Sequence, residues 1–268
     1  MNTTVELFFG LPPKDPETKH FPLLDSPWPL TTIIAVYLIF VLKLGPKFME
    51  NRKPYNLTYI LSIYNIFQVI YNSILFGLGI NYMIINPAYD RSCMMHLPLD
   101  HPEKYIERWI CYTFFINKII DLLDTVFFVL RKSYKQITLL HVYHHVLMTA
   151  PAYWVFQFYG FGGQYATMGF LNTGVHAVMY FYYFISARYP ELKGSLWWKK
   201  YITKLQLLQF IILFIQPIYV LLFNPGCKFP LFLHILQLIV STSMVTMFSR
   251  FYYLAYVKPK PQKLLKQE

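Results

Sequence analysis

The sequence predicts an all-α integral membrane protein with seven transmembrane helices, built as a single domain over residues 1–268. Hydrophobic residues make up 56% of the chain and charged residues only 14%, too few to cover the surface of a soluble domain of this length. The apolar residues also gather into stretches of about 20 residues, the length that a helix needs to cross a bilayer. The predicted spans cover residues 28–44, 57–85, 109–130, 137–158, 165–187, 201–223 and 231–256.

The positive charges of the chain lie mostly on one side of these predicted spans. The formal net charge is +11, and most Lys and Arg residues follow the first, third, fifth and seventh spans. Because positive residues favour the cytosolic side of a membrane, we expect a lumenal N-terminus and a cytosolic C-terminus. The basic residues lie in short loops between spans, which gives no support to a nucleic-acid partner.

The three cysteines fall at informative places in this topology. Cys93 and Cys227 lie in loops on the predicted lumenal side, whereas Cys111 lies near the start of a helix. Because the lumen is oxidising, we expect a Cys93–Cys227 disulfide that joins two distant loops. Two free thiols are the alternative.

The third predicted span contains ionisable residues, which are costly in hydrocarbon and generally face a cavity or a partner. Lys118, Asp121 and Asp124 recur at intervals of three residues, so they share a helix face and Lys118 can pair with Asp121. All three are candidate catalytic residues. A structural ion pair between helices is the alternative, and for Asp124 it is equally well supported. The second span carries another polar face, made of Asn65, Gln68 and Asn72.

A histidine cluster opens the fourth predicted span. His141, His144 and His145 lie within five residues of each other, and His141 shares a helix face with both of the others. One buried histidine is more often structural, but three together in hydrocarbon favour a catalytic role. In the fifth span, Asn172 and His176 lie four residues apart and are candidates for the same site.

Basic and polar side chains also mark the start of the sixth predicted span. Lysines lie where the span enters the membrane, and two glutamines lie deeper. Such basic residues suit a ligand that carries several phosphates. Taken singly, a Gln or Tyr between helices more often serves helix packing. The candidate substrate-binding residues are Arg131, Tyr180, Tyr182, Lys199, Lys200, Thr203, Lys204, Gln206 and Gln209.

Metal chemistry is one interpretation of the histidines. A membrane di-iron oxygenase needs several histidine clusters, because two irons must be filled largely by imidazole and carboxylate. This chain has one cluster and His176, which is too few for two irons. A single metal held by one histidine of the cluster together with His176 stays open on count alone.

Nucleophilic chemistry is the second interpretation. An imidazole kept neutral by a low-dielectric site can attack a thioester and form a reactive acyl-imidazole. Neighbouring imidazoles can move protons or hold tautomers. Amide and phenol donors such as Asn172, Tyr180, Gln206 or Gln209 could stabilise the oxyanion. A third interpretation, a seven-span receptor or transporter, fits the topology but does not explain the histidine cluster beside a lysine–carboxylate helix.

Four motifs in this order resemble those of the family that elongates very long chain fatty acids, and the resemblance extends from the first span to the seventh. Together they are highly specific, whereas the histidine box alone is less so. They are Lys118-x-x-Asp121-x-x-Asp124, His141-Val-Tyr-His144-His145, Asn172-x-x-x-His176-x-x-x-Tyr180 and Lys199-Lys-Tyr-Ile-Thr203-x-x-Gln206-x-x-Gln209.

The resemblance implies a very-long-chain 3-oxoacyl-CoA synthase of the endoplasmic reticulum membrane, which condenses a long-chain acyl-CoA with malonyl-CoA. It implies six helices around a long acyl tunnel, with the first span outside. It also implies that His144 accepts the acyl group, that His176 assists, and that no metal or cofactor takes part. A homodimer and the other enzymes of the elongation cycle are further expected partners. The family commonly has Glu where this chain has Asp121, which is one methylene shorter.

Overall fold

The computed structural model describes residue 10 and residues 14–189 and 198–258, and these form helices without a strand. Each predicted span falls on helical residues. The longer helices are α2 (Pro27–Ile39), α4 (Thr58–Ile80), α5 (Lys104–Ile120), α6 (Leu123–Leu130), α7 (Leu139–Phe158), α8 (Tyr165–Arg188), α9 (Lys199–Phe223) and α10 (Leu231–Tyr252). Shorter elements are η1 (Pro16–His20), η2 (Phe40–Leu44), α3 (Gly45–Met49), η3 (Asn81–Ile85), η4 (Tyr134–Gln136) and η6 (Tyr253–Val257).

Four helices of the described residues are long and apolar enough to cross a membrane by length and composition. They cover Pro27–Met49, Thr58–Ile85, Lys199–Phe223 and Leu231–Val257, at the first, second, sixth and seventh predicted spans. The third predicted span was wrong as a continuous helix, because α5 ends at Ile120 and α6 begins at Leu123. At this break, Leu122 N donates to Ile119 O and Asp124 N donates to Asp121 O, and each bond spans three residues instead of the four of an α-helix.

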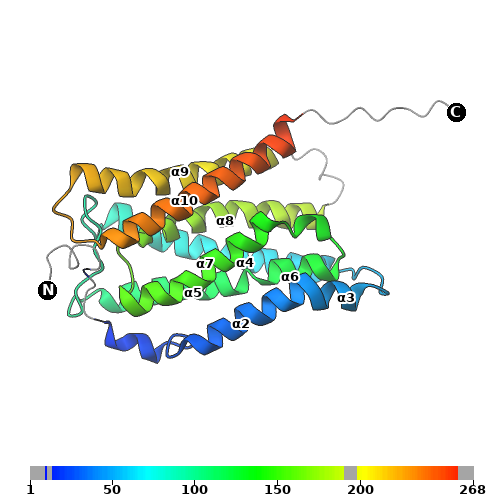
Figure 1. The fold of residues 1–268 in the computed structure, drawn as a ribbon, viewed down its shortest axis with the longest axis horizontal. Coiled ribbons are helices and arrows are strands. Elements are labelled where there is room, and N and C mark those ends of the chain that lie inside the picture. Colours follow the sequence, from blue (N-terminus) through cyan, green and yellow to red (C-terminus); the bar gives the residue numbers. More distant parts are fainter. Residues whose placement is uncertain (1–9, 11–13, 190–197, 259–268) are drawn as a thin grey trace.

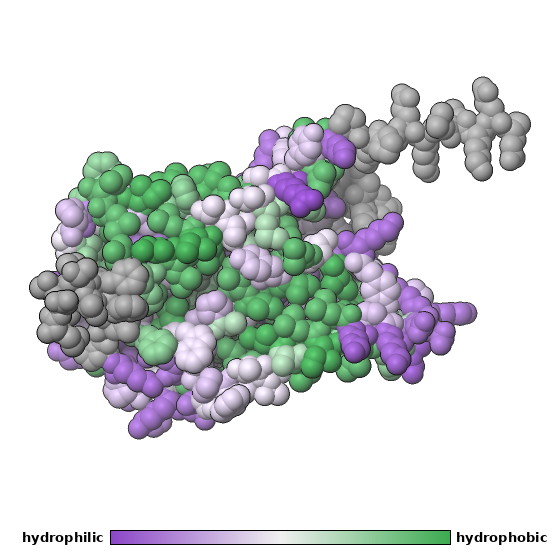
Figure 2. Space-filling model, viewed as in Figure 1, coloured by the Kyte–Doolittle hydropathy of each residue, from purple (hydrophilic) through white to green (hydrophobic). Residues whose placement is uncertain are grey.

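The helices run alternately between two ends of the bundle (Figure 1). One end holds the turns after α3 and after α6 and the start of α9, and we call it the basic end because Lys53, Arg131 and Lys200 lie there. The other end holds Cys93 and Cys227, and we call it the cysteine end. On the face shown in Figure 2, an apolar belt lies between polar ends, as expected for a protein in a bilayer.

Helices α4 and α8 make the most extensive helix pair of the bundle. Small residues let their backbones approach, as is typical of membrane helices. A Cβ atom at Gly79 would lie 2.7 Å from the Phe170 ring, and one at Gly174 would lie 2.8 Å from the Phe76 ring. Phe76 and Phe170 stack on each other between the helices, with ring centroids 5.0 Å apart.

The predicted disulfide is confirmed at the cysteine end. Cys93 and Cys227 are bonded, with Cα atoms 5.4 Å apart and a sequence separation of 134. Asn224 Nδ2 donates to Ser92 O at 3.1 Å beside the bridge. The disulfide therefore ties the segment before α5 to the segment before α10.

An apolar cavity lies inside the bundle, and α4, α5, α7, α8, α9 and α10 each contribute to its wall. None of its lining residues comes from α2. Examples of wall residues, one from each helix in that order, are Leu75, Phe114, Met148, Met168, Phe210 and Met244.

Tyr89 and Glu107 line the cavity near the cysteine end, and we call this polar part of its wall the floor. Lys104 Nζ pairs with Glu107 Oε2 at 2.6 Å, and both side chains are buried. Tyr89 donates its hydroxyl to Glu107 Oε1 at 2.7 Å. Burial, and then the Glu107 charge, raise the pKa of Tyr89, so it stays a donor. A Cβ at Gly162 would collide with Glu107, so glycine lets this floor pack closely.

Candidate active site

Lys118 is the centre of a buried polar cluster at the junction of α5, α6 and α8. Its side chain lies in the last turn of α5, and Asp121 caps the same helix. Lys118 Nζ lies 2.7 Å from Asp121 Oδ2, 2.9 Å from Asn172 Oδ1 and 3.3 Å from His176 Nδ1. The ion pair is only 1% and 3% exposed. Three predicted motif residues thus converge on one ammonium group.

This geometry indicates where His176 carries its proton. A lysine ammonium has hydrogens to donate and no acceptor. The contact from Lys118 therefore makes Nδ1 of His176 an acceptor and leaves the proton of the neutral ring on Nε2. His176 Nδ1 also lies 3.4 Å from Asp121 Oδ2, but bonding there requires a proton on Nδ1, which the nearer ammonium disfavours.

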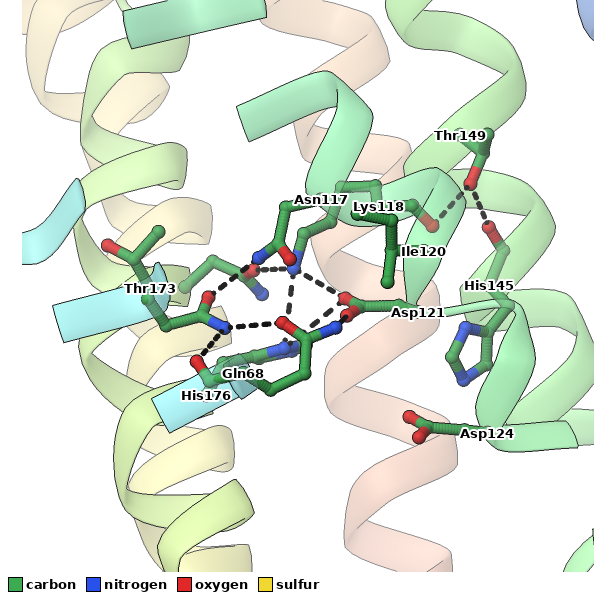
Figure 3. Close-up of polar contacts among 12 residues, drawn as sticks. Gln68, Asn117, Lys118, Ile120, Asp121, Asp124, His145, Thr149, Thr173 and His176 are labelled. Carbon is green, nitrogen blue, oxygen red and sulfur yellow. Dashed lines mark hydrogen bonds and ion pairs between the residues drawn. The ribbon is translucent and has the colours of Figure 1, made fainter. Parts of the chain in front are cut away.

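The carboxylate of Asp121 is held from its other side by α4 and α8. Gln68 Nε2 donates to Asp121 Oδ1 at 2.8 Å, and Figure 3 shows Gln68 and Lys118 converging on this carboxylate. The Tyr180 hydroxyl lies 3.0 Å from Asp121 Oδ1 and 2.7 Å from Asp124 Oδ2. Asp124 therefore joins the cluster through Tyr180.

The histidine box lies in the first two turns of α7. Thr138 caps this helix, and its Oγ1 accepts a hydrogen bond from His141 N at 3.2 Å. The rings of His141 and His145 meet edge to face with centroids 4.3 Å apart. Thr149 Oγ1 donates to His145 O at 2.8 Å, as Figure 3 shows. Helix α7 therefore begins with the His141 and His145 rings packed on each other.

His144 lies between the polar cluster and the cavity. Its ring centroid is 6.5 Å from that of His176 and 6.4 Å from that of Phe210. Phe210 in turn lines the cavity, so the His144 imidazole lies beside the end of the cavity that is nearer the polar cluster. Among the described residues, the structure gives the His144 ring nitrogens no hydrogen-bond partner, whereas His141 and His176 have theirs.

The predicted substrate-binding residues separate into two groups. The cations Arg131, Lys199, Lys200 and Lys204 are exposed at the basic end. The others lie inside the bundle. Gln206 Nε2 contacts Met179 Sδ at 3.7 Å, Tyr182 packs on Trp198, Thr203 is buried, and Gln209 is buried and lines the cavity. Tyr180 belongs to the polar cluster instead.

Sequence reasoning left several members of the site unassigned. Gln68 was placed on a polar face of the second span but given no role. Asn72 and Asn117 extend the same network, with Asn117 Nδ2 donating to Asn72 Oδ1 at 2.9 Å. Thr125 bonds His141 Nε2 at 2.9 Å, and its position directly after Asp124 was the available signal. Tyr37, which contacts Thr125, had no such signal.

Metal-ligating side chains do not form a set of three in the part of the chain that the structure describes. For the single-metal alternative, His144 and His176 face each other as two candidate ligands, but no His, Cys, Asp or Glu among those residues completes a set of three.

Comparison with known proteins places these motifs in a family. Residues 22–264 match the GNS1/SUR4 family, which is nearly the whole chain. The chain belongs to the GNS1/SUR4 family. Very long chain fatty acid elongase F of Drosophila melanogaster is 43% identical over 92% of this chain and 95% of its own length. Very long chain fatty acid elongase 7 of Rattus norvegicus is 38% identical, over 91% and 86% of the two chains.

Very long chain fatty acid elongase 4 of Homo sapiens is 34% identical over 98% of this chain and 82% of its own length. The resemblance stated from the motifs is thus confirmed at the level of the family. As a GNS1/SUR4 member with four candidate spans among its described residues, the chain is a multi-pass membrane protein of a fatty acid elongase family. This family assignment replaces the interpretation of the chain as a receptor or transporter.

Proposed function

We propose that this protein is an acyltransferase that condenses a long-chain acyl-CoA with malonyl-CoA. The products are 3-oxoacyl-CoA, CoA and CO2, and no metal or cofactor takes part. Family membership supports the elongation of an acyl chain, and the site supplies imidazoles, an ammonium and amides beside an apolar cavity. The observation that most directly supports this proposal is the position of His144, whose ring contacts Phe210 of the cavity wall and faces His176.

In the first step, a ring nitrogen of His144 attacks the thioester carbonyl. The C–S bond breaks, CoA leaves as a thiolate, and the proton from the other ring nitrogen neutralises the charge. The product is an acyl-imidazole and free CoA. Asn172 accepts from Lys118 through Oδ1, which leaves its amide N–H groups to stabilise the developing oxyanion.

In the second step, malonyl-CoA loses CO2 and forms an enolate that attacks the acyl carbon. The C–N bond to His144 breaks as the new C–C bond forms, and the imidazole regains a proton. His176, with its proton on Nε2, is placed to donate to the enolate oxygen, and Lys118 holds the ring in that tautomer. The Lys118–Asp121 pair thus acts by positioning His176.

The cavity would hold the acyl chain, with six helices around it and α2 outside. Its polar floor at Glu107 would limit the chain's depth. The exposed cations of the basic end, which include Arg131, Lys199, Lys200 and Lys204, would bind the CoA phosphates from the cytosol. The disulfide suits an oxidising lumen at the cysteine end, so we propose the endoplasmic reticulum membrane with a lumenal N-terminus. A homodimer and contacts with other elongation-cycle enzymes stay predictions.

The test is to incubate purified enzyme with acyl-CoA alone. We expect free CoA to appear and an acyl mass on His144, followed by its discharge as 3-oxoacyl-CoA when malonyl-CoA is added. His144→Ala should fold and bind acyl-CoA yet show neither event. The matched control is His234→Ala, since His234 is a buried histidine of α10 outside the site. CoA that appears only after malonyl-CoA is added would overturn the acyl-histidine step. Activity lost to chelators and restored by iron or zinc would favour a metal mechanism.

A further inference from the structure

Helix α2 contributes nothing to the cavity wall, but one of its side chains reaches the histidine box. The Tyr37 hydroxyl lies 2.8 Å from Thr125 Oγ1. Thr125 Oγ1 lies 2.9 Å from His141 Nε2. Tyr37 is 5% exposed and Thr125 is 0% exposed, so both hydroxyls are buried, whereas His141 is half-buried.

Apolar packing holds the chain in place. Tyr37 and Val41 pack against Leu122 and Val129, which lie on either side of Thr125 in sequence. A hydroxyl left unpaired in an apolar environment is costly, so both hydroxyls are expected to stay bonded. The contact therefore links the helix outside the cavity to α6 and α7 at a defined point.

Hydrogen-bond counting gives the chain a direction. If His141 Nε2 carried the proton, it would donate to Thr125, Thr125 would donate to Tyr37, and the Tyr37 hydroxyl would need another acceptor. Among the described residues, Thr125 Oγ1 is the hydrogen-bond partner that the structure gives this hydroxyl. If Thr125 Oγ1 instead accepted from both neighbours, its own hydrogen would lack an acceptor among the described residues. In the reverse direction Tyr37 donates to Thr125 and Thr125 donates to bare Nε2, so both buried hydroxyls and Nε2 are satisfied. His141 then carries its proton on Nδ1.

We propose that Tyr37 is a positioning residue that fixes, through Thr125, the Nδ1–H tautomer and the orientation of His141. The His141 ring lies against His145, with centroids 4.3 Å apart, so its tautomer sets the proton pattern of the box. Helix α2, which is part of a candidate membrane span, thereby also supports the active site. The inference rests on the proposed function in so far as the box performs the chemistry.

Steady-state kinetics of matched variants test this hydrogen-bond chain from Tyr37 through Thr125 to His141, which we call the relay. Tyr37→Phe and Thr125→Val each remove one hydroxyl and keep the shape of the side chain. We expect each to lower kcat roughly 2- to 10-fold, the value of one hydrogen bond, with KM unchanged. Because the hydroxyls act in series, the double variant should lose no more than Thr125→Val alone. Thr125→Ser should retain kcat, and Tyr219→Phe, an exposed tyrosine of α9, should behave as wild type.

Wild-type kcat in Tyr37→Phe, or multiplied losses in the double variant, would overturn the relay. An independent measurement reads the tautomer without turnover. In protein labelled with ¹⁵N-histidine, the His141 signals, assigned by their loss in His141→Asn, should show the proton on Nδ1 and should change in Tyr37→Phe. A proton on Nε2 would refute the proposal even in an active enzyme. If instead no acyl-histidine forms but these signals behave as expected, the proposed mechanism fails and the relay stands.

Discussion

At the scale of single residues, the site depends on how one buried ammonium is neutralised. Removing an ion from water costs several kcal/mol, and a partner offsets this only when the geometry is good and the remaining polar atoms are bonded. Lys118 meets that condition with Asp121, Asn172 and His176 as acceptors. Asp121 meets it with Lys118 and Gln68, whose amide donates at 2.8 Å. Removing one partner leaves an uncompensated buried charge.

Breaking this pair should therefore cost more than removing it. We expect Lys118→Met or Asp121→Asn alone to lower the free energy of unfolding by about 3–5 kcal/mol. The double variant should lose clearly less than the sum, because no unpaired charge remains. Thermal or denaturant unfolding of the purified protein in detergent measures both. Strictly additive losses would show that the two side chains are not coupled.

Lys104 offers a matched control at the opposite end of the same helix. It pairs with Glu107 at the same spacing of three residues and is equally buried. Lys104→Met should lower stability comparably but reduce the turnover of folded enzyme far less than Lys118→Met, because Lys104 does not contact a histidine of the site. Equal losses of turnover in both would assign Lys118 a purely structural role.

At the scale of elements, regular helical geometry is interrupted between α5 and α6 and at Pro217 of α9. At the first interruption, Asp121 is the C-cap of α5 and its carboxylate pairs with Lys118 three residues earlier. In α9, Pro217 has no N–H, so Leu213 O loses its helical donor. Gln237 Nε2 of α10 replaces it, donating to Leu213 O at 2.9 Å. A buried side chain of one helix thus repairs the proline defect of another.

This repair predicts a conditional cost. Gln237→Met should leave Leu213 O unpaired and lower the free energy of unfolding by about 1–3 kcal/mol. In a Pro217→Ala background the same change should cost less, since the substituted position then has a backbone N–H that can bond Leu213 O. Unfolding midpoints of the four proteins in detergent give the comparison. An identical cost in both backgrounds would mean that the proline is not the reason for the Gln237 contact.

At the scale of the whole molecule, the two ends of the bundle differ in chemistry. The basic end carries exposed cations, and the cysteine end carries the disulfide and the buried Lys104–Glu107 pair. Because the sequence separation of Cys93 and Cys227 is 134, the bridge closes a loop that includes α5 to α9. A crosslink over so long a loop restricts the unfolded chain strongly.

Reduction of this bridge should destabilise the protein. We expect a thiol reductant to lower the free energy of unfolding by roughly 2–5 kcal/mol. Cys93→Ser with Cys227→Ser should show the lower stability without reductant and no further response to it. Cys111→Ser, which removes the free thiol, should keep the wild-type response. A reductant effect that persists in the double serine variant would attribute it to something other than the bridge.

Local pattern was enough to predict much of this molecule. Hydropathy placed the predicted spans on the long helices, with α5 and α6 merged into one, because membrane helices need long apolar stretches. Spacings of three and four residues brought the members of each polar face together, since these intervals place side chains on one side of a helix. Loop placement also paired Cys93 with Cys227, since both fell on one predicted side.

What only the tertiary structure decided is how those faces meet. Gln68 reaches Asp121 across 53 residues of sequence, and Tyr37 reaches Thr125 across 88. Neither contact follows from periodicity, because it depends on the packing and rotation of whole helices against one another. The break after Ile120 was equally hidden, since neither the hydropathy nor the spacing of Lys118, Asp121 and Asp124 indicates where the helix is interrupted. Local pattern determines which residues share a face, and packing determines what that face touches.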